Sequence, residues 1–226
     1  MKNAAIILVR SDSKRLPKKY AKNLGNRKLL EWPILALQKA GIEVIISTTE
    51  RSIDDRIIDI AHKHKIKFFR GDLLDVSKRY AETLKKYNLE YSFRINGDSP
   101  FINQKLVKST LKIISTQKFD LVTNLIDRSY PYGISLEVIK SSTFLNNYNY
   151  FNTYQKEHIT NYFYINKDNF KIKKLTYKDN IPENMRFVVD TYEDLTKLNS
   201  IVAQNDNVDF NCIEIKDLIK IYLKND

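Results

Sequence analysis

Short apolar runs alternate with amphipathic segments over the first half of the sequence. The runs with the length and apolar content of buried strands are residues 4–9, 43–47, 66–69, 91–95 and 119–123. Helical apolar spacing fills the intervals, at residues 30–40, 52–64, 75–87 and 103–115. Since parallel strands need crossover connections of about a dozen residues, this alternation predicts an α/β fold with a mostly parallel, Rossmann-like sheet flanked by helices.

The alternation becomes irregular after Asn124. Residues 134–139 and 170–175 have extended patterns, and an aromatic-rich helical pattern lies between them at residues 157–166. A last apolar run at residues 185–189 ends in Asp190, and helical patterns follow at residues 195–203 and 213–223. We therefore expect a single domain over residues 1–226 with an insertion at residues 124–175.

Composition narrows the class of protein. The chain has no apolar run near the roughly 18 residues of a membrane-spanning helix, and its first apolar run is too short for a secretory signal. Its one cysteine, Cys212, excludes an internal disulfide and fits a reducing cytoplasm. The net charge of +11 comes from scattered lysines without a basic block, so we expect no nucleic-acid partner and no membrane partner.

The first apolar run ends in a loop rich in positive charge. Residues 10–19 read R-S-D-S-K-R-L-P-K-K. The loop matches neither G-x-x-x-x-G-K-[ST] nor G-x-G-x-x-G, so neither a Walker-type kinase nor a dinucleotide-binding dehydrogenase is indicated. Guanidinium and ammonium groups bind phosphate oxygens, which favours a polyphosphate site, although a basic surface loop has the same composition.

Two aspartates follow predicted strands. Asp98 lies in the turn N-G-D-S-P after residues 91–95, and Asp190 follows residues 185–189. Ligands bind beyond the carboxyl ends of parallel strands, and Mg²⁺ needs only one or two protein carboxylates because water and phosphate complete its shell. Taken alone, Asp98 is more ordinarily a turn residue without a ligand, and Asp190 could simply precede a helix cap.

Together these motifs resemble a known family. The pattern R-x-x-S-x-R-L-P-x-K, the G-D-x-P turn at Asp98 and the V-D-T-x-E-D-L segment at Asp190 are similar to those of the N-acylneuraminate and 3-deoxy-octulosonate cytidylyltransferase superfamily. The chain looks most like its spore-coat polysaccharide biosynthesis branch. The resemblance implies Mg²⁺ as cofactor, held by Asp98 and Asp190, and Arg10, Lys19 and Asp98 as catalytic residues. The nucleotide-binding residues that it implies are Arg10, Ser13, Arg15, Lys19, Thr48, Arg70 and Asp98.

Weaker matches concern the sugar acceptor. Residues 128–138 resemble R-[ST]-Y-P-x-G-[LI]-x-x-E-V and residues 157–160 resemble E-H-[VI]-T, which implies substrate contacts by Tyr130, Glu137 and His158. In this family the insertion forms a lid and much of a dimer interface. Its aromatic side chains suit an interface and a second small core equally.

Further matches lie after the second and third predicted strands. Residues 70–80 resemble R-G-x-x-x-D-V-x-x-R-Y, where Arg70, Asp75 or Arg79 either contacts the nucleotide or only braces a helix. Thr48 follows the second strand, near where the resemblance implies the base would lie.

The resemblance implies a cytidylyltransferase that moves CMP from CTP to an acidic sugar, a ulosonic or nonulosonic acid, and releases pyrophosphate. We further expect a homodimeric, cytoplasmic enzyme of surface polysaccharide biosynthesis. One alternative is a nucleotidyltransferase that uses another nucleotide or a sugar or polyol phosphate. The other is a catalytically idle module that binds anions.

The sequence departs from the family pattern at several positions. Asp12 adds an anion where relatives often carry a small residue, and Lys18 replaces a frequent glycine. Tyr132 and Ser135 stand where the branch often has aspartate. If those carboxylates contact the acceptor in relatives, this protein is expected to use a different sugar.

Overall fold

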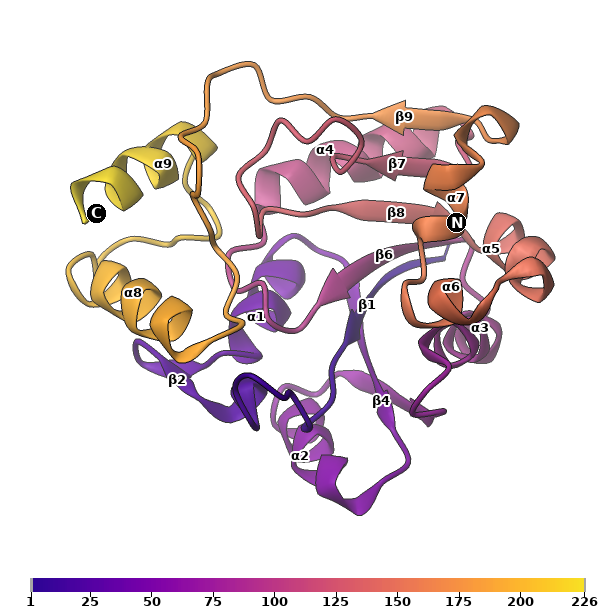
Figure 1. Cartoon of the computed structure of the whole chain (residues 1–226), viewed down its shortest axis with the longest axis horizontal. Helices are drawn as coiled ribbons and strands as arrows, with labels where there is room; N and C mark the ends of the chain where they lie inside the picture. The colour runs from indigo at the N-terminus through magenta and orange to yellow at the C-terminus, as the bar shows by residue number, and fades with distance from the viewer. Residues whose placement is uncertain (1, 226) are drawn as a thin grey trace.

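The computed structural model describes residues 2–225, in which a main sheet carries helices on both faces (Figure 1). Its strands, in the spatial order β5-β4-β1-β6-β8-β7-β9, are β1 (Asn3–Leu8), β4 (Glu43–Thr49), β5 (Lys67–Gly71), β6 (Tyr91–Asn96), β7 (Leu121–Thr123), β8 (Glu137–Lys140) and β9 (Ile172–Lys174). Only β8 runs antiparallel to its neighbours, β6 and β7, among the strand pairs of this sheet in the described residues. The predicted α/β fold with a mostly parallel sheet is confirmed.

Helices occupy most of the predicted intervals. The α-helices are α1 (Glu31–Lys39), α2 (Asp55–Lys63), α3 (Val76–Tyr87), α4 (Gln104–Thr116), α5 (Ser141–Asn147), α6 (Thr153–Glu157), α7 (Asn161–Ile165), α8 (Tyr192–Ala203) and α9 (Ile215–Lys224). Short 3-10 helices are η1 (Lys19–Ala21), η2 (Ser52–Asp54), η3 (Tyr148–Tyr150) and η4 (Lys167–Asn169), and β2 (Asn23–Leu24) pairs with β3 (Arg27–Lys28) outside the main sheet.

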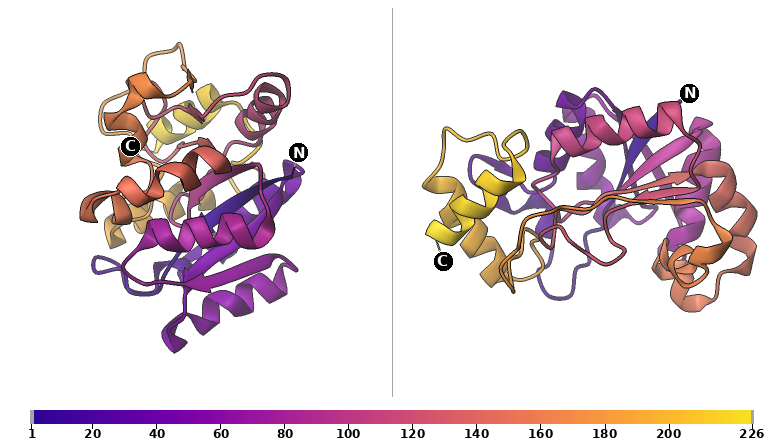
Figure 2. Two further views of the ribbon diagram at one scale, coloured as in Figure 1. Left: turned by 90° about the vertical axis from the view of Figure 1, so that its right-hand side faces the viewer. Right: turned by 90° about the horizontal axis from the view of Figure 1, so that it is seen from above.

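Successive side chains of β1 point to opposite faces of the sheet and pack in two different core clusters. Ala5 and Ile7 pack in one cluster with residues of α1, α2 and α4, and Ala4 and Ile6 pack in another with residues of α3, α5 and α7. A third cluster, around Trp32, joins α8 and α9 to α1. Seen from above, α8 and α9 therefore lie at one end of the molecule and α5 to α7 at the other (Figure 2).

Residues 124–175, the expected insertion, contribute to the main sheet. They supply β8 and β9, close to the extended segments predicted at residues 134–139 and 170–175. The helix predicted at residues 157–166 is replaced by α6 and α7, because His158 has a non-helical backbone (φ −107°, ψ 75°). Phe151 and Phe163 are buried in the same cluster as Ala4 and Ile6, so these aromatic side chains extend the main core, while Tyr150 and Tyr154 stay exposed.

The strand predicted at residues 185–189 is wrong. This run makes an isolated bridge between Tyr132 and Arg186, in which the Phe187 amide donates to the Tyr132 carbonyl at 2.7 Å. Phe187 and Val189 are buried in the third cluster with α8 and α9. The apolar pattern of residues 185–189 therefore reflects packing against α8 and α9 and does not reflect pairing with a neighbouring strand.

The contact with this run depends on Gly133. Its φ is +97°, and an added Cβ would lie 2.4 Å from the carbonyl carbon of Phe187. We expect Gly133→Ala to lower the free energy of unfolding by about 3 kcal/mol, since steric overlap adds to backbone strain. Gly41→Ala is the matched control, because Gly41 also has a positive φ (+81°) but has no atom within 4 Å of the new Cβ. Urea denaturation compares the two, and equal losses would contradict the steric argument.

Candidate active site

Ser11 fastens the cationic loop to η2, the 3-10 helix that follows β4. The Ser11 amide donates to Asp54 Oδ1 at 2.8 Å, and its hydroxyl donates to the Ile53 carbonyl at 3.0 Å. The Lys18 amide donates back to the Ser11 carbonyl at 3.0 Å, which closes the loop. Lys18 itself is left-handed, with φ of 52°, a conformation that glycine adopts with less strain. The side chains between these two anchors are thereby presented to the space beyond the strand ends.

Asp54 and Arg51 hold this loop through hydrogen bonds and ion pairs. Burial alone would raise the pKa of Asp54, but hydrogen bonds from Thr49 and Ser11 outweigh it and hold the pKa below its ordinary value of 3.8. Arg51 bridges Asp54 at 3.2 Å and Asp12 at 2.8 Å. The hydrogen bond from Arg51 also lowers the pKa of Asp12.

The extra anion at Asp12 is therefore compensated within the protein. Besides Arg51, Asp12 contacts Arg10, whose Nε lies 3.3 Å from Oδ1. Asp12 is bound by two guanidinium groups before any phosphate arrives, so its carboxylate does not stand unpaired in the site.

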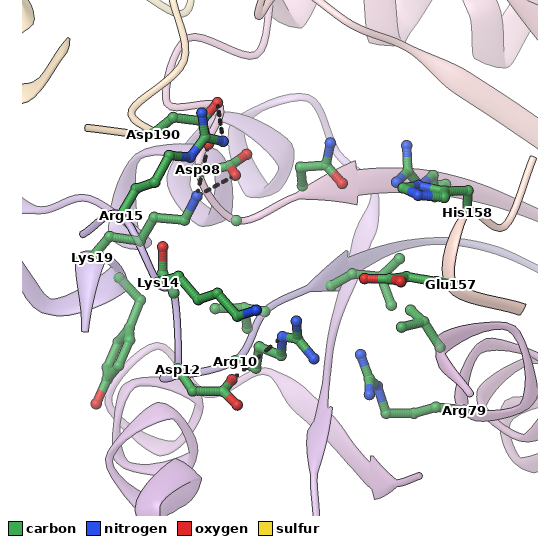
Figure 3. Close-up of a pocket in the computed structure, with 18 residues that line it drawn as sticks. Arg10, Asp12, Lys14, Arg15, Lys19, Arg79, Asp98, Glu157, His158 and Asp190 are labelled. Atoms are coloured by element: carbon green, nitrogen blue, oxygen red, sulfur yellow. Dashed lines mark hydrogen bonds and ion pairs between the residues drawn. The ribbon is translucent and has the colours of Figure 1, made fainter. Parts of the chain in front are cut away.

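Asp98 and Asp190 converge, as the sequence predicts. Lys19 Nζ lies 2.6 Å from Asp98 Oδ2 and 3.2 Å from Asp190 Oδ1, and Figure 3 shows this ammonium group between the two carboxylates. Their backbones are joined as well, because the Val189 amide donates to the Asp98 carbonyl at 2.9 Å. Arg15 adds a contact of 3.2 Å to Asp190 Oδ2.

The start of α8 fixes Asp190. Thr191 caps this helix through a capping box with Asp194, whose Oδ2 also accepts from the Asp190 amide at 2.9 Å. Arg186 contacts Asp190 Oδ2 at 3.4 Å and Asp194 Oδ1 at 3.3 Å. The carboxylate of Asp190 is therefore held by its own helix terminus and by neighbouring cations.

These groups face a cavity of about 580 Å³ that is lined by both loop and sheet residues. The predicted site residues that the structure brings to its wall are Arg10, Ser13, Arg15, Lys19, Asp98, His158 and Asp190. In Figure 3 the carboxylate pair lies on one side of this group of residues, and Arg79, Glu157 and His158 lie on the other.

Four predicted residues do not line this cavity: Thr48, Arg70, Tyr130 and Glu137. Thr48 and Glu137 are 0% and 1% exposed, and the Glu137 carboxylate is occupied by Arg94 and by the Tyr164 hydroxyl. Arg70 is a brace, since it donates to the carbonyls of Thr49 and Arg51 at 3.0 and 2.8 Å and pairs with Asp55 at 2.7 Å. The Tyr130 ring packs on Tyr177 in the third cluster, with the ring centroids 5.5 Å apart.

Two arginines at the cavity wall, the buried Arg79 and the partly buried Arg94, received little or no weight in the sequence analysis. Arg79 is 2% exposed, and burial, followed by the charge of Arg10, lowers its pKa to about 10. Arg94 pairs with Glu137 at 2.6 Å across the β6–β8 junction. Within the described residues, the Nε atoms of both arginines are buried without a hydrogen-bond partner. The available signal was an arginine inside the apolar run of β6.

A family model described as "Cytidylyltransferase" matches residues 4–217. The chain belongs to the cytidylyltransferase family. It is 28% identical over 223 residues to an uncharacterized protein of Methanocaldococcus jannaschii, covering 97% of this chain and 90% of that protein. It is 22% identical over 205 residues to the spore coat polysaccharide biosynthesis protein SpsF of Bacillus subtilis, covering 87% of this chain and 84% of that one.

Other relatives extend the comparison. The cytidylyltransferase is 26% identical over 128 residues to 3-deoxy-manno-octulosonate cytidylyltransferase of Photobacterium profundum, covering 54% of this chain and 50% of that protein. A solved cytidylyltransferase structure from Leptospira borgpetersenii has a TM-score of 0.89 at 27% identity, covering 100% of this chain and 95% of that one. Family membership makes the chain a nucleotidyltransferase and implies CTP and a sugar as substrates. From residue 2 to residue 225, no helix has the length and apolar character that crossing a bilayer requires.

The donor set of this cytidylyltransferase fits a nucleotide-linked Mg²⁺ ion. Residues 2–225 contain no group of three or more His, Cys, Asp or Glu side chains that could hold a metal ion. Mg²⁺ is commonly held by one or two carboxylates together with substrate phosphates, which is the set that Asp98 and Asp190 offer beside a cationic loop. The pair therefore suits an ion that arrives with a polyphosphate.

The departures at Tyr132 and Ser135 engage arginines. The guanidinium carbons of Arg128 and Arg186 each lie 4.9 Å from the centroid of the Tyr132 ring. Arg128 also donates to the Ser135 hydroxyl at 3.3 Å. A ring face and a hydroxyl attract a guanidinium group without neutralising it, so this part of the cytidylyltransferase keeps more positive charge than aspartates would leave.

The anchor at Asp54 leads to a stability prediction. We expect Asp54→Asn to lower the free energy of unfolding by about 2 kcal/mol at pH 7, because buried donors lose a charged acceptor. The folded pKa of Asp54 lies below 3.8, so its stabilisation is present above that value and is lost as the pH falls through the folded pKa. The difference in the free energy of unfolding between Asp54→Asn and the wild type should therefore become smaller at acidic pH. Urea titrations at several pH values measure it.

The control for this variant is Asp209→Asn, which changes an exposed aspartate paired with Lys39 at 2.8 Å. Exposed ion pairs contribute about 0–1 kcal/mol, so this variant should stay close to the wild type. Equal stability of Asp54→Asn and the wild type at neutral pH would contradict the anchoring role of Asp54.

Proposed function

We propose that this cytidylyltransferase transfers CMP from CTP to an acidic sugar, a ulosonic or nonulosonic acid, for surface polysaccharide biosynthesis. The observation that carries the proposal is the convergence of Asp98 and Asp190 beside the cationic loop at one cavity. The names of two relatives support the finer assignment. 3-Deoxy-manno-octulosonate is an acidic sugar, and SpsF is named for spore coat polysaccharide biosynthesis.

The proposed reaction makes one bond and breaks one. A sugar hydroxyl oxygen attacks the α-phosphorus of CTP, and the bond from that phosphorus to the oxygen bridging the β-phosphate breaks. Pyrophosphate leaves with the bonding electrons, and the hydroxyl proton passes to solvent. Arg10, Arg15 and Lys19 line the cavity and would stabilise the charge on the departing phosphates, while the Ser13 hydroxyl would add a donor.

Asp98 and Asp190 would hold Mg²⁺, which when bound supplies positive charge at the α-phosphate and lowers the pKa of the attacking hydroxyl. The protein's own part is to place the carboxylates. The Val189 amide and the capping box at Thr191 fix their separation before substrate binds. Because the two carboxylates are already close together, the protein backbone would need little rearrangement to hold the ion beside the α-phosphate.

The far wall of the cavity is proposed to contact the sugar and the nucleoside. Arg79 and Arg94 offer unpartnered Nε donors there, and His158 lies on the same wall. Glu137 would act through Arg94 rather than touch substrate, because it is buried and its second oxygen accepts from the Tyr164 hydroxyl at 2.5 Å. Binding of acceptor oxygens would satisfy donors that are otherwise costly to bury.

We also propose that the enzyme is a cytoplasmic homodimer. Tyr150, Tyr154 and Ile165 are exposed on η3, α6 and α7, at one end of the molecule (Figure 1). Large exposed side chains of this kind suit an interface between copies. Light scattering during gel filtration should give twice the mass of one chain, and the mass of a single chain would contradict the proposal.

The metal role of Asp98 has a direct kinetic test. We expect Asp98→Asn to reduce kcat for pyrophosphate release by about 10²-fold or more, by analogy with the loss of one preorganised electrostatic contact. Assays with CTP and a panel of ulosonic and nonulosonic acids measure this rate. Asp217→Asn, which changes an exposed aspartate paired with Lys220 on α9, should keep the wild-type rate. A fully active Asp98→Asn would contradict the proposed site.

The nucleotide preference separates the proposal from its alternatives. With Mg²⁺, CTP at 100 times its Kd should stabilise the protein by about 2.7 kcal/mol, and other nucleoside triphosphates should do less. Thermal shifts measure the order. Stabilisation by a different nucleotide would favour the alternative nucleotidyltransferase. Absence of any nucleotide preference, with steeply salt-dependent binding of polyanions, would favour an idle anion-binding module.

A further inference from the structure

Lys19 occupies the oxygens that a divalent ion would need. Its ammonium nitrogen lies 2.6 Å from Asp98 Oδ2 and 3.2 Å from Asp190 Oδ1 and so contacts both carboxylates at once. Mg²⁺ binds carboxylate oxygens at about 2.0–2.1 Å. An ion shared by the same two oxygens would overlap the ammonium group, so the two cations cannot be bound there together.

The carboxylates are already compensated without a metal. Asp190 Oδ2 contacts Arg15 at 3.2 Å and Arg186 at 3.4 Å, while Oδ1 contacts Lys19. The side chains of Lys19, Asp98 and Asp190 are 15–20% exposed, so their attraction is only partly screened by water. A divalent ion that binds without nucleotide must displace Lys19 from both aspartates. The ammonium group of Lys19 then loses its two carboxylate partners.

A polyphosphate provides an alternative partner for Lys19. The side chain lines the same cavity as Arg10 and Lys14, and a lysine stem has several rotatable bonds. Phosphate oxygens bound by the loop could accept the ammonium group when it leaves the aspartates. The cation exchange is then favourable only when nucleotide is present.

We propose that Lys19 is an internal counter-cation that couples metal binding to nucleotide binding. This inference rests on the proposed metal role of Asp98 and Asp190. Without nucleotide, Lys19 holds the two carboxylates and excludes divalent ions. With nucleotide, Lys19 moves to the phosphates and frees both oxygens. Linkage makes the effect reciprocal, so the metal strengthens nucleotide binding by the same factor.

The test measures binding of Mn²⁺ to the protein without nucleotide, by electron paramagnetic resonance. Lys19→Met keeps the length of the apolar stem and removes the charge. We expect it to bind Mn²⁺ about tenfold more tightly than the wild type, because one unit charge is removed from direct contact with the carboxylates. Affinity equal to or weaker than the wild type would overturn the inference.

Lys14→Met is the matched control. Lys14 lines the same cavity but, in the described part of the chain, forms no ion pair with a carboxylate. It should change Mn²⁺ affinity by less than about twofold, since its charge is not in contact with the aspartates. Equal tightening by Lys14→Met and Lys19→Met would show a general effect of cavity charge and would overturn the specific role of Lys19.

A second variant covers a folding defect in Lys19→Met. Lys19→Gln is also uncharged but can still donate a hydrogen bond to a carboxylate, and Mn²⁺ should raise its melting temperature more than it raises that of the wild type. If Mn²⁺ raises the melting temperature of folded Lys19→Gln no more than that of the wild type, the inference fails.

Mn²⁺ titrations with a non-hydrolysable CTP analogue separate this inference from the proposed function. The wild type should gain Mn²⁺ affinity with the analogue, beyond the binding measured for the analogue alone, and Asp98→Asn should not. If the wild type shows no such gain, the proposed metal site fails and the inference fails with it. If the wild type gains affinity but Lys19→Met behaves as the wild type without nucleotide, only the inference fails.

Discussion

The meeting of two distant turns is the constraint on which the site depends. The amide of Val189 donates to the carbonyl of Asp98, so the turn after β6 and the start of α8 are held at a fixed separation. Asp98 and Asp190 bring like charges together at this point, which is unfavourable unless a cation lies between them. Lys19 supplies that cation, and the loop after β1 is thereby drawn over the same cavity.

A second set of charged residues, separate from the Asp98–Asp190 pair, holds the start of the loop. Asp54 is completely buried beneath Ser11, and Arg51 connects it to Asp12. A buried carboxylate is tolerated only when hydrogen bonds satisfy its oxygens, and here backbone, hydroxyl and guanidinium donors all contribute. The loop is therefore fastened at both ends, and Arg10, Lys14 and Arg15 of this loop line the cavity. The anionic departure at Asp12 belongs to this support rather than to the phosphate site.

The sequence predicted the sheet from local patterns, whereas the convergence of Asp98 and Asp190 was implied only by the family resemblance. Apolar runs separated by helical spacing leave few arrangements other than parallel strands, and Asp98 and Asp190 each follow a recognisable run. The same pattern misled at residues 185–189. Apolar alternation reports burial, and it does not report whether the neighbour is a strand edge or the helices α8 and α9.

The far wall was harder to predict because it depends on contacts between distant segments. Arg94 is held by an ion pair with Glu137 on β8. No sequence motif contains both residues, so their contact could not be predicted. Tyr130 matched a family pattern, but a motif does not fix the direction of a ring, and this ring packs on Tyr177. Ser11 and Asp54 are common residue types whose pairing becomes visible only when η2 and the loop lie together.

The late position of Asp190 has a consequence for synthesis of the chain. A polypeptide emerging from the ribosome exposes the cationic loop first, and β6 with Asp98 follows long before α8 has been made. The second carboxylate arrives only when the core that joins α8 and α9 to Trp32 can assemble. A nascent chain therefore holds an incomplete centre until α8 and α9 have been translated, and a product truncated ahead of Asp190 lacks half of the carboxylate pair.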